Sequence, residues 1–171
     1  MSDARLRALR EEDLDALAAK ETAEFDPWNN FEIGASNRFR RRFAENGGIG
    51  EESGMLAVET EEGRLIGSVS WFTVQHGPSA ACRALNVGFS LFPEYRGRGH
   101  GTRAQRLLSE YLFSTRLLER VEASTDVQNI AEQRALEKAG FSREGVLRHA
   151  QYRDGQWRDL VMFSRLRTDR V

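Results

Sequence analysis

A glycine-rich loop between an alternating strand and an amphipathic helix constrains this sequence more than any other feature. Leu85–Leu91 alternates apolar with small or polar residues, the pattern of a strand with one buried face. Thr102–Ser114 carries apolar residues at i, i+3, i+4, i+7 and i+8, which predicts a helix with one buried stripe. Between them lies Phe92–Gly101, called here the glycine-rich loop. The chain must therefore contain a strand that turns sharply into a helix.

Further strands and helices are predicted on both sides of this unit. Strands are predicted at Arg5–Leu9, Met55–Glu59, Leu65–Val74 and Arg120–Thr125, a hairpin at Gln151–Arg153 and Gln156–Arg165, and helices at Glu11–Glu24, Phe31–Glu45 and Asn129–Ala139. Gly47–Gly54 holds four glycines in eight residues and predicts a connecting loop. Helices that alternate with strands indicate an α/β (α+β) fold with a mixed sheet. A chain of 171 residues predicts one domain over residues 1–171.

The charge balance and the cysteine count exclude several classes of protein. Lysine and arginine total 25 against 26 acidic residues, so the net charge of −1 gives no general electrostatic attraction to nucleic acid or to an anionic membrane. Cys82 is the single cysteine, which excludes an intrachain disulfide. We see no apolar leader and no membrane-length apolar run, so we expect a cytoplasmic protein. No metal site is predicted, and a homodimer stays open.

The glycine-rich loop has the chemistry of an anion-binding turn. The alternating glycines Gly97, Gly99 and Gly101 let backbone N–H groups approach an anion without obstruction by side chains. The following helix N-terminus adds unpaired N–H donors and partial positive charge. Arg96 and Arg98 add full charges at the edge of the loop. These features together favour a pyrophosphate ligand.

Two common phosphate motifs do not match this loop. No Gly-Lys-Ser/Thr follows it, which excludes a P-loop, and Thr102 stands where a dinucleotide fingerprint requires its third glycine. Taken alone, Gly97–Gly101 is equally compatible with a flexible surface turn or with an RNA-binding fragment rich in arginine and glycine. The surrounding sequence decides between these alternatives.

The pattern Arg96-x-x-Gly99-x-Gly101, placed between a strand and a helix, resembles the acyl-CoA signature of the GNAT N-acetyltransferases. The segment Asn129–Phe141 resembles their second signature. The branch that acetylates ribosomal-protein N-termini (RimJ/RimL) is resembled by Leu6–Leu14, Glu144–Arg148, Tyr152–Gly155 and Asp159–Phe163. This resemblance covers nearly the whole chain. It implies a mixed, strongly bent sheet of about seven strands with about four helices. It also implies that CoA lies in a V-shaped cleft between the fourth and fifth strands.

The resemblance also implies which residues bind acetyl-CoA. The expected set is Leu91, Phe92, Arg96, Gly97, Arg98, Gly99, His100, Gly101, Thr102 and Asn129. Pantetheine is expected to pair with the backbone near Leu91 and Phe92, and the N–H near Phe92 is expected to stabilise the oxyanion. Asn129 is expected at the pantetheine arm, although a helix cap, or both roles together, explains it equally well.

The residues that would move protons do not follow the family pattern. Asn86 stands at the usual position of a glutamate base, and Leu136 at that of a tyrosine acid. A RimL-like pattern would place serine and glutamate where this chain has Glu132 and Gln151. Glu132 is predicted either as a base or as half of a capping box. His76, with Glu59, could activate the amine through water, or could be an ordinary strand residue.

The expected reaction is direct attack of a primary amine on the acetyl thioester, most favourably by an α-amine of a protein or peptide. Alternatives are a small-molecule acetyltransferase for an antibiotic, polyamine or amino acid, a CoA-binding sensor without catalysis, and an RNA-binding module. Candidate acceptor-side aromatics, equally compatible with core packing, are Trp28, Phe31, Trp71 and Tyr152. Arg38 and Arg40–Arg42 form either a solvated helix face or a guide for an acidic acceptor. Cys82 is interpreted as structural.

Overall fold

A seven-stranded mixed sheet organises the fold, with the strand order β1-β2-β3-β4-β5-β7-β6. The computed structural model describes residues 4–23, 27–28 and 36–169. The strands are β1 (Arg5–Ala8), β2 (Ser53–Glu59), β3 (Leu65–Gln75), β4 (Arg83–Leu91), β5 (Arg120–Asp126), β6 (Ser142–Arg153) and β7 (Gln156–Leu166). The described helices are α1 (Glu11–Ala23), α2 (Ser36–Asn46), α3 (His100–Thr115) and α4 (Ile130–Lys138), with 3-10 turns η1 (Ala80–Cys82) and η2 (Pro93–Tyr95). This architecture confirms the predicted fold class.

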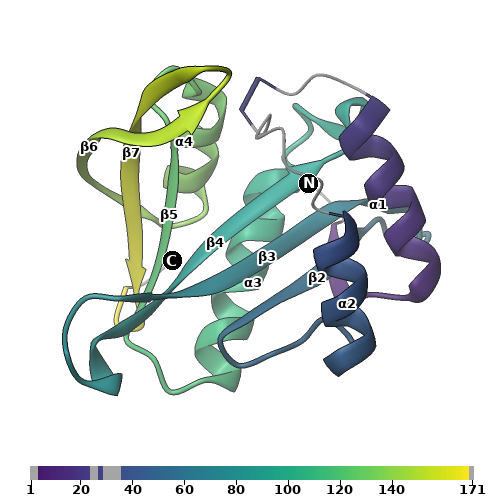
Figure 1. The fold of residues 1–171 in the computed structure, drawn as a ribbon, viewed down its shortest axis with the longest axis horizontal. Coiled ribbons are helices and arrows are strands. Elements are labelled where there is room, and N and C mark those ends of the chain that lie inside the picture. The colour runs from purple at the N-terminus through teal and green to yellow at the C-terminus, as the bar shows by residue number, and fades with distance from the viewer. Residues whose placement is uncertain (1–3, 24–26, 29–35, 170–171) are drawn as a thin grey trace.

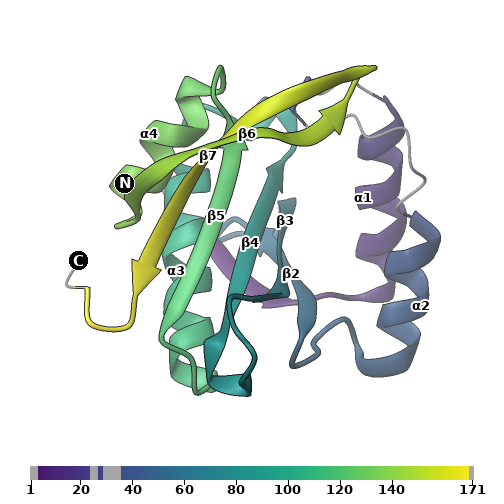
Figure 2. The ribbon, with the colours of Figure 1, turned by 60° about the vertical axis from the view of Figure 1, so that its left-hand side comes forward.

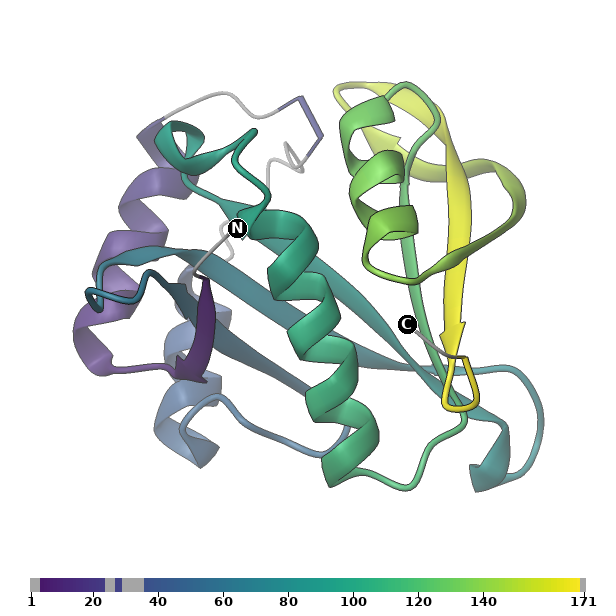
Figure 3. The ribbon, with the colours of Figure 1, turned by 180° about the vertical axis from the view of Figure 1, so that it is seen from behind.

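The sheet divides into two halves that diverge from each other. Neighbouring strands are antiparallel except β4 and β5, which are parallel and join β1–β4 to β5–β7. Figure 1 shows β4 and β5 close together at one end and separated at the other. Figure 2 shows α1 and α2 on one side of the sheet and α3 and α4 on the other. From behind, in Figure 3, α3 and α4 run side by side, one on each half.

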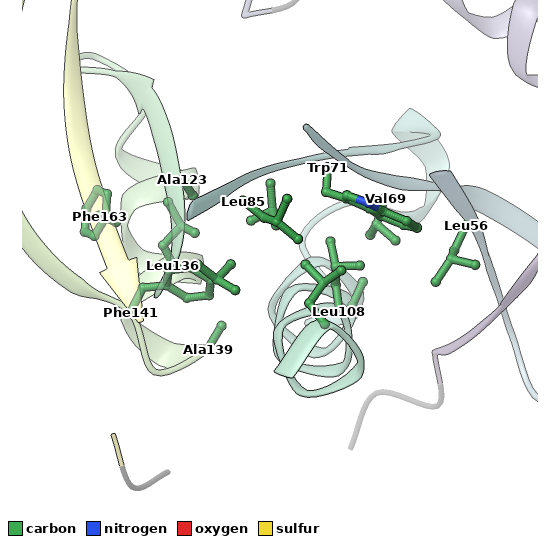
Figure 4. Packing of buried hydrophobic residues seen from close by; sticks show 14 of the residues in the cluster. Leu56, Val69, Trp71, Leu85, Leu108, Ala123, Leu136, Ala139, Phe141 and Phe163 are labelled. Atoms are coloured by element: carbon green, nitrogen blue, oxygen red, sulfur yellow. The ribbon is translucent and has the colours of Figure 1, made fainter. Parts of the chain in front are cut away.

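The main core lies between the sheet and the α3 side. Val69, Trp71, Leu85 and Leu108 are each at most 3% exposed and pack together there (Figure 4). Burying one such aliphatic side chain stabilises the fold by about 1.5–3 kcal/mol. A smaller cluster, Leu9, Leu14, Met55 and Ala57, fills the space under α1. The alternation predicted for β4 is confirmed, because Leu85, Val87 and Leu91 are buried.

The buried face of α3 is wider than its apolar stripe predicts. Gln105 and Ser109 are buried beside Ala104, Leu108 and Leu112. The reason is that α3 packs against both halves of the molecule. Its apolar residues face the β1–β4 half, whereas Ser109 meets Arg165 of β7 and Gln105 meets α4.

The twelve-residue strand β6 corrects the prediction of a three-residue strand at Gln151–Arg153. β6 forms the edge of the sheet, and most of its residues are exposed. Register shifts between Arg143 and Gly145 and between Leu147 and Gln151 break the two-residue period. His149 lies at one of these shifts with φ of 49°. The alternation that signals a strand is therefore absent from this segment.

Element boundaries differ by a few residues elsewhere. The helix predicted from Thr102 begins two residues earlier, at His100. The predicted helix at Phe31–Glu45 is observed as Ser36–Asn46, and its residues 31–35 lie outside the described residues, as does Glu24. None of the described helices combines the length and apolarity that crossing a bilayer requires.

Candidate active site

A cleft of about 500 Å³ opens where β4 and β5 separate. In the described part of the chain these strands pair at Leu85 with Val121 and at Asn86 with Glu122, and no further along. The cleft wall consists of residues from β4, the glycine-rich loop, α3, β5, α4 and the β6–β7 hairpin, together with Trp28. The predicted V-shaped opening is thus present at the carboxyl ends of the two strands.

The backbone of β4 turns alternate residues towards the cleft. The N–H of Phe92 donates to the carbonyl of Ile66 at 2.9 Å, so Phe92 is directed towards β3. Hydrogen-bonded and non-bonded residues alternate in an antiparallel pair. The N–H groups of Leu91 and Phe89 therefore point towards β5 and the cleft. This geometry favours Leu91 over Phe92 as the backbone donor to a bound thioester.

The glycine-rich loop forms an open cradle at the mouth of the cleft. Gly97 has φ of 73° and Gly99 has φ of 83°, the left-handed region that glycine adopts without strain. Gly99 is the N-cap of α3 and provides no side-chain cap, and the first turn of α3 holds no acidic residue. The first N–H groups of α3 therefore point out of the helix end, where they can donate to an anion. Arg96, Gly97, Gly99, Gly101 and Thr102 line the cleft, as expected for pyrophosphate-binding residues.

Three residues of the expected set lie outside this lining. Phe92 is buried and directed towards β3, Arg98 is exposed, and His100 is 8% exposed and packs edge-on against Tyr95. Arg96 reaches inward, because its Nε donates to the carbonyl of Leu91 at 3.0 Å. This hydrogen bond fixes the loop against the end of β4.

The cleft also fits an extended amide-bearing arm. A Cβ on Gly101 would come within 2.9 Å of the Phe89 ring, so only glycine lets α3 approach β4 this closely.

Gln105 Oε1, which also borders the cleft, is buried and has no hydrogen-bond partner among the described residues. A ligand N–H in the cleft would satisfy this acceptor. Pantetheine carries such N–H groups, and the loop suits its attached pyrophosphate.

One face of α4 lines the opposite wall. Asn129, Glu132 and Leu136, spaced i, i+3 and i+7, all contribute to the lining. The cap at Asn129 is confirmed, since its Oδ1 accepts from the Glu132 N–H at 3.3 Å and its Nδ2 donates to Thr125 Oγ1 at 3.1 Å. The second half of the capping box is wrong. The Glu132 carboxylate instead accepts from Gln105 Nε2 at 2.8 Å.

Glu132 has the most altered carboxyl chemistry in the cleft. Burial raises its pKa to about 8, although the hydrogen bond from Gln105 opposes this shift. The residue is only partly buried as a whole, because it borders the open cleft, but its carboxyl group is enclosed between α3 and α4. At neutral pH this group is mostly protonated. It can therefore release a proton as well as accept one.

The mouth of the cleft on the hairpin side is organised by Arg153, which is 3% exposed. Its guanidinium donates to Asp126 Oδ2 at 2.5 Å, to Gln151 Oε1 at 2.5 Å and to the Trp28 carbonyl at 3.3 Å. The guanidinium carbon lies 5.8 Å from the centroid of the Trp28 ring. Arg153 thus connects β5, β6 and the residue 27–28 segment at one point.

Residues 4–142 match the sequence profile of the acetyltransferase (GNAT) domain. This chain belongs to the GNAT acetyltransferase family. GNAT acetyltransferases use acetyl-CoA as the acetyl donor, which agrees with the expected co-substrate. Together with the fold, this match confirms the resemblance inferred from the glycine-rich loop and from Asn129–Phe141.

Individual GNAT relatives differ in their acceptors. Spermidine N(1)-acetyltransferase of Escherichia coli is 36% identical over 113 residues, 66% of this chain and 59% of that protein. The [ribosomal protein uS5]-alanine N-acetyltransferase of Escherichia coli is 28% identical over 104 residues, 61% of this chain and 52% of that protein. The chain thus spans little more than half the length of either relative. The crystal structure of ribosomal-protein-S5-alanine acetyltransferase from Vibrio fischeri has a TM-score of 0.78 at 22% identity, over 99% of this chain and 96% of that one.

Other candidates lie away from the GNAT cleft. His76 follows β3 at the closed end of the V, where its Nε2 lies 2.9 Å from Oε2 of the buried Glu122. Glu59 accepts from Arg7 Nε at 2.6 Å at the far side of the sheet. Neither residue is among those that line the cleft in the described part. The structure therefore brings Glu132, and not His76, to the glycine-rich loop.

Of the predicted acceptor-side aromatic residues that the structure describes, one lines the cleft and two do not. Trp28 lines the cleft, Trp71 is 1% exposed in the core, and Tyr152 is 58% exposed on the outer face of the hairpin beside Trp157. Phe31 lies outside the described residues, as do the side chains of Arg38 and Arg42. Of the other helix arginines, Arg40 pairs with Asp15, and Arg41 lies 4.0 Å from Glu45.

Sequence reasoning did not identify Gln105, Asp126 or Arg153 as site residues. Gln105 interrupts the apolar stripe of α3 beside Ala104, and a polar residue at the edge of such a stripe can mark a second packing partner. Arg153 lies two residues after Gln151 on β6, but its partners Asp126 and Trp28 are 27 and 125 positions away along the chain. Local patterns carry no information about such partners.

We predict that Glu132 makes folding stability depend on pH. The unfolded carboxyl has a pKa near 4.3, whereas the folded one has a pKa of about 8. Between these values the folded state holds the extra proton, so stability falls as pH rises. Urea unfolding should show that the free energy of unfolding of the wild type falls by a few kcal/mol, at most about 4, between about pH 5 and 8. Glu132→Gln should not show this loss. The exposed Glu137→Gln is the control, and parallel curves for wild type and Glu132→Gln would refute the shift.

Proposed function

We propose that this protein transfers the acetyl group of acetyl-CoA to the α-amine of a protein or peptide. The glycine-rich loop and the N-terminus of α3 hold the pyrophosphate, and the Leu91 N–H faces the thioester carbonyl. The neutral amine attacks the carbonyl carbon, a C–N bond forms and the C–S bond breaks. Positioning in the cleft supplies much of the rate, since no covalent enzyme intermediate is required.

The observation that carries the acceptor assignment is the charge of the cleft. The charged residues that line it in the described part of the chain are Asp126, Glu132, Arg96, Arg134, Lys138 and Arg153. Asp126 is neutralised by its buried ion pair with Arg153. The raised pKa of Glu132 keeps that carboxyl mostly uncharged at pH 7. A polyamine with several ammonium groups therefore finds few anionic partners among these residues, whereas a single α-amine needs none.

The acidity of the acceptor supports the same choice. An α-amine has a reference pKa near 7.7–8.0, and a lysine amine near 10.4. At pH 7 roughly 10% of the former is neutral, against roughly 0.04% of the latter. This difference in nucleophile availability is worth about 3 kcal/mol. Leu136 and Gln151, which replace the expected acid–base residues, offer no help in removing a tightly held proton.

The decisive experiment offers three amines to one enzyme preparation. Two peptides share one sequence, one with a free N-terminus and a blocked lysine, the other with these reversed, and spermidine is the third acceptor. We expect at least about tenfold higher kcat/KM for the free N-terminus between pH 6.5 and 8, measured by thiol release and mass spectrometry. A doubly blocked peptide controls for thioester hydrolysis. Preference for lysine would contradict the α-amine assignment, and preference for spermidine would favour the polyamine alternative suggested by that relative.

A further inference from the structure

Glu132 lies on the side of the cleft formed by α3, the helix that follows the glycine-rich loop. Its carboxylate is bonded to Gln105 of α3, the helix whose first turn belongs to the glycine-rich loop. Figure 2 shows α3 and α4 on one face of the sheet, while the end of the β6–β7 hairpin reaches over towards α1 on the other. Gln151 and Arg153 belong to that hairpin end. An acceptor entering past the hairpin therefore approaches from the side opposite Glu132.

We infer that Glu132 is the general acid that protonates the departing CoA thiolate, and that Gln105 is the residue that positions it. The inference rests on the proposed acetyl transfer. As the C–S bond breaks, the electron pair stays on sulfur and the Glu132 O–H gives its proton to that atom. The acetylated amine releases one proton to water, and the Glu132 carboxylate takes one back from water. The products are an amide and a CoA thiol, so atoms and charges balance.

The proton affinity of Glu132 suits this role. Because its pKa is about 8, Glu132 is mostly protonated at pH 7, and most molecules therefore carry the acid form and few the basic form. A free thiol has a reference pKa near 8.5, which makes proton transfer from Glu132 to the thiolate nearly balanced. A bound pyrophosphate would add negative charge nearby and keep Glu132 protonated.

Gln105 is the side chain that holds the Glu132 carboxyl group in place, through the hydrogen bond from its Nε2. The charged side chains that line the cleft with Glu132 in the described part of the chain are Arg96 in the loop, Asp126 at the end of β5, Arg153 on β6, and Arg134 and Lys138 on α4. Burial and the Gln105 hydrogen bond are the causes that set the pKa of Glu132. Gln105 is itself 2% exposed, so its amide is held firmly in place.

The direction of the pH dependence separates an acid from a base. Dividing the kcat of the wild type by that of Glu132→Gln cancels the titration of the acceptor amine, which both enzymes share. With both substrates saturating, this ratio should be about 100 and level below about pH 8, and should fall above it, because the acid is lost. A base would make the ratio rise through the same range. Gln105→Leu removes a hydrogen bond that lowers the pKa of Glu132, so the fall should move to higher pH. The exposed Glu137→Gln, on the same helix, should leave the profile unchanged.

A binding measurement tests the location of Glu132 without turnover. We expect ¹³C NMR to show the Glu132 carboxyl titrating near pH 8 in the free protein and at different midpoints in complexes with CoA and with desulfo-CoA, which lacks the thiol. Neighbouring titrating groups shift each other. Equal midpoints, an unchanged kcat in Glu132→Gln, or a ratio of wild-type to Glu132→Gln kcat that rises through pH 8 would each overturn the acid role. If no amine is acetylated, the proposed function fails, while the NMR titration still decides whether Glu132 faces the sulfur.

Discussion

Replacing Arg153 by methionine should lower the free energy of unfolding by about 3–5 kcal/mol, the range for a buried ion pair that loses one partner. Arg153 and Asp126 are each 3% exposed and their charged groups lie 2.5 Å apart. Methionine fills a similar volume but leaves the Asp126 carboxylate buried without a counter-ion. Urea unfolding measures the loss. Arg148→Met, at an exposed position of the same strand, should change stability by less than about 0.5 kcal/mol.

A second substitution tests whether the lost stability comes from the unpaired charge. Asp126→Asn in the Arg153→Met background removes that charge and keeps Oδ1, which accepts from the Gln128 N–H at 2.8 Å. We expect the double variant to be more stable than Arg153→Met alone, because neutral buried groups are less costly than an unpaired carboxylate. A double variant that is less stable than the single one would show that Arg153 acts through its contacts with Trp28 and Gln151 instead. Those contacts tie the acceptor mouth to β5.

The glycine turn and the helix cap could be predicted from the sequence, because each depends on residues that are close together along the chain. Gly97 and Gly99 lie in the predicted turn with positive φ, and Asn129 caps α4 as its spacing indicates. The same local rule failed at Glu132. A capping box considers only the first turn of one helix, whereas α3 supplies Gln105 as a partner from 27 residues away. Tertiary packing overrode the local preference.

The place of His76 follows from topology and not from residue type. β3 and β4 are antiparallel, with Gln75 opposite Arg83, so a residue just after β3 lies beside the start of β4. β4 and β5 still pair there, and the cleft opens at the other end of both strands. A histidine after β3 is therefore directed to the closed end of the V. The sequence contains this information only once the strand order is known.

The glycine-rich loop gives the second large expected effect. Gly99→Asp should weaken CoA binding by at least about 100-fold, equivalent to about 2.7 kcal/mol. Aspartate at this position would have to adopt φ of 83°, a backbone conformation that is unfavourable for L-residues. Its Cβ and negative charge also stand at the N-cap of α3, where the pyrophosphate would meet the first N–H groups. Calorimetric titration with CoA measures the change, and circular dichroism checks that the fold is retained.

The matched control for Gly99→Asp is Gly47→Asp, in the loop between α2 and β2. Gly47 has φ of 65°, and a Cβ there would meet no atom within 4 Å, so backbone strain and added charge are similar while the cleft is untouched. Gly47→Asp should leave CoA affinity within about twofold of wild type. If both variants weaken binding equally, the loss comes from general destabilisation. If a folded Gly99→Asp protein binds CoA normally, the pyrophosphate lies elsewhere, and the alignment of Leu91 and Glu132 with the thioester fails with it.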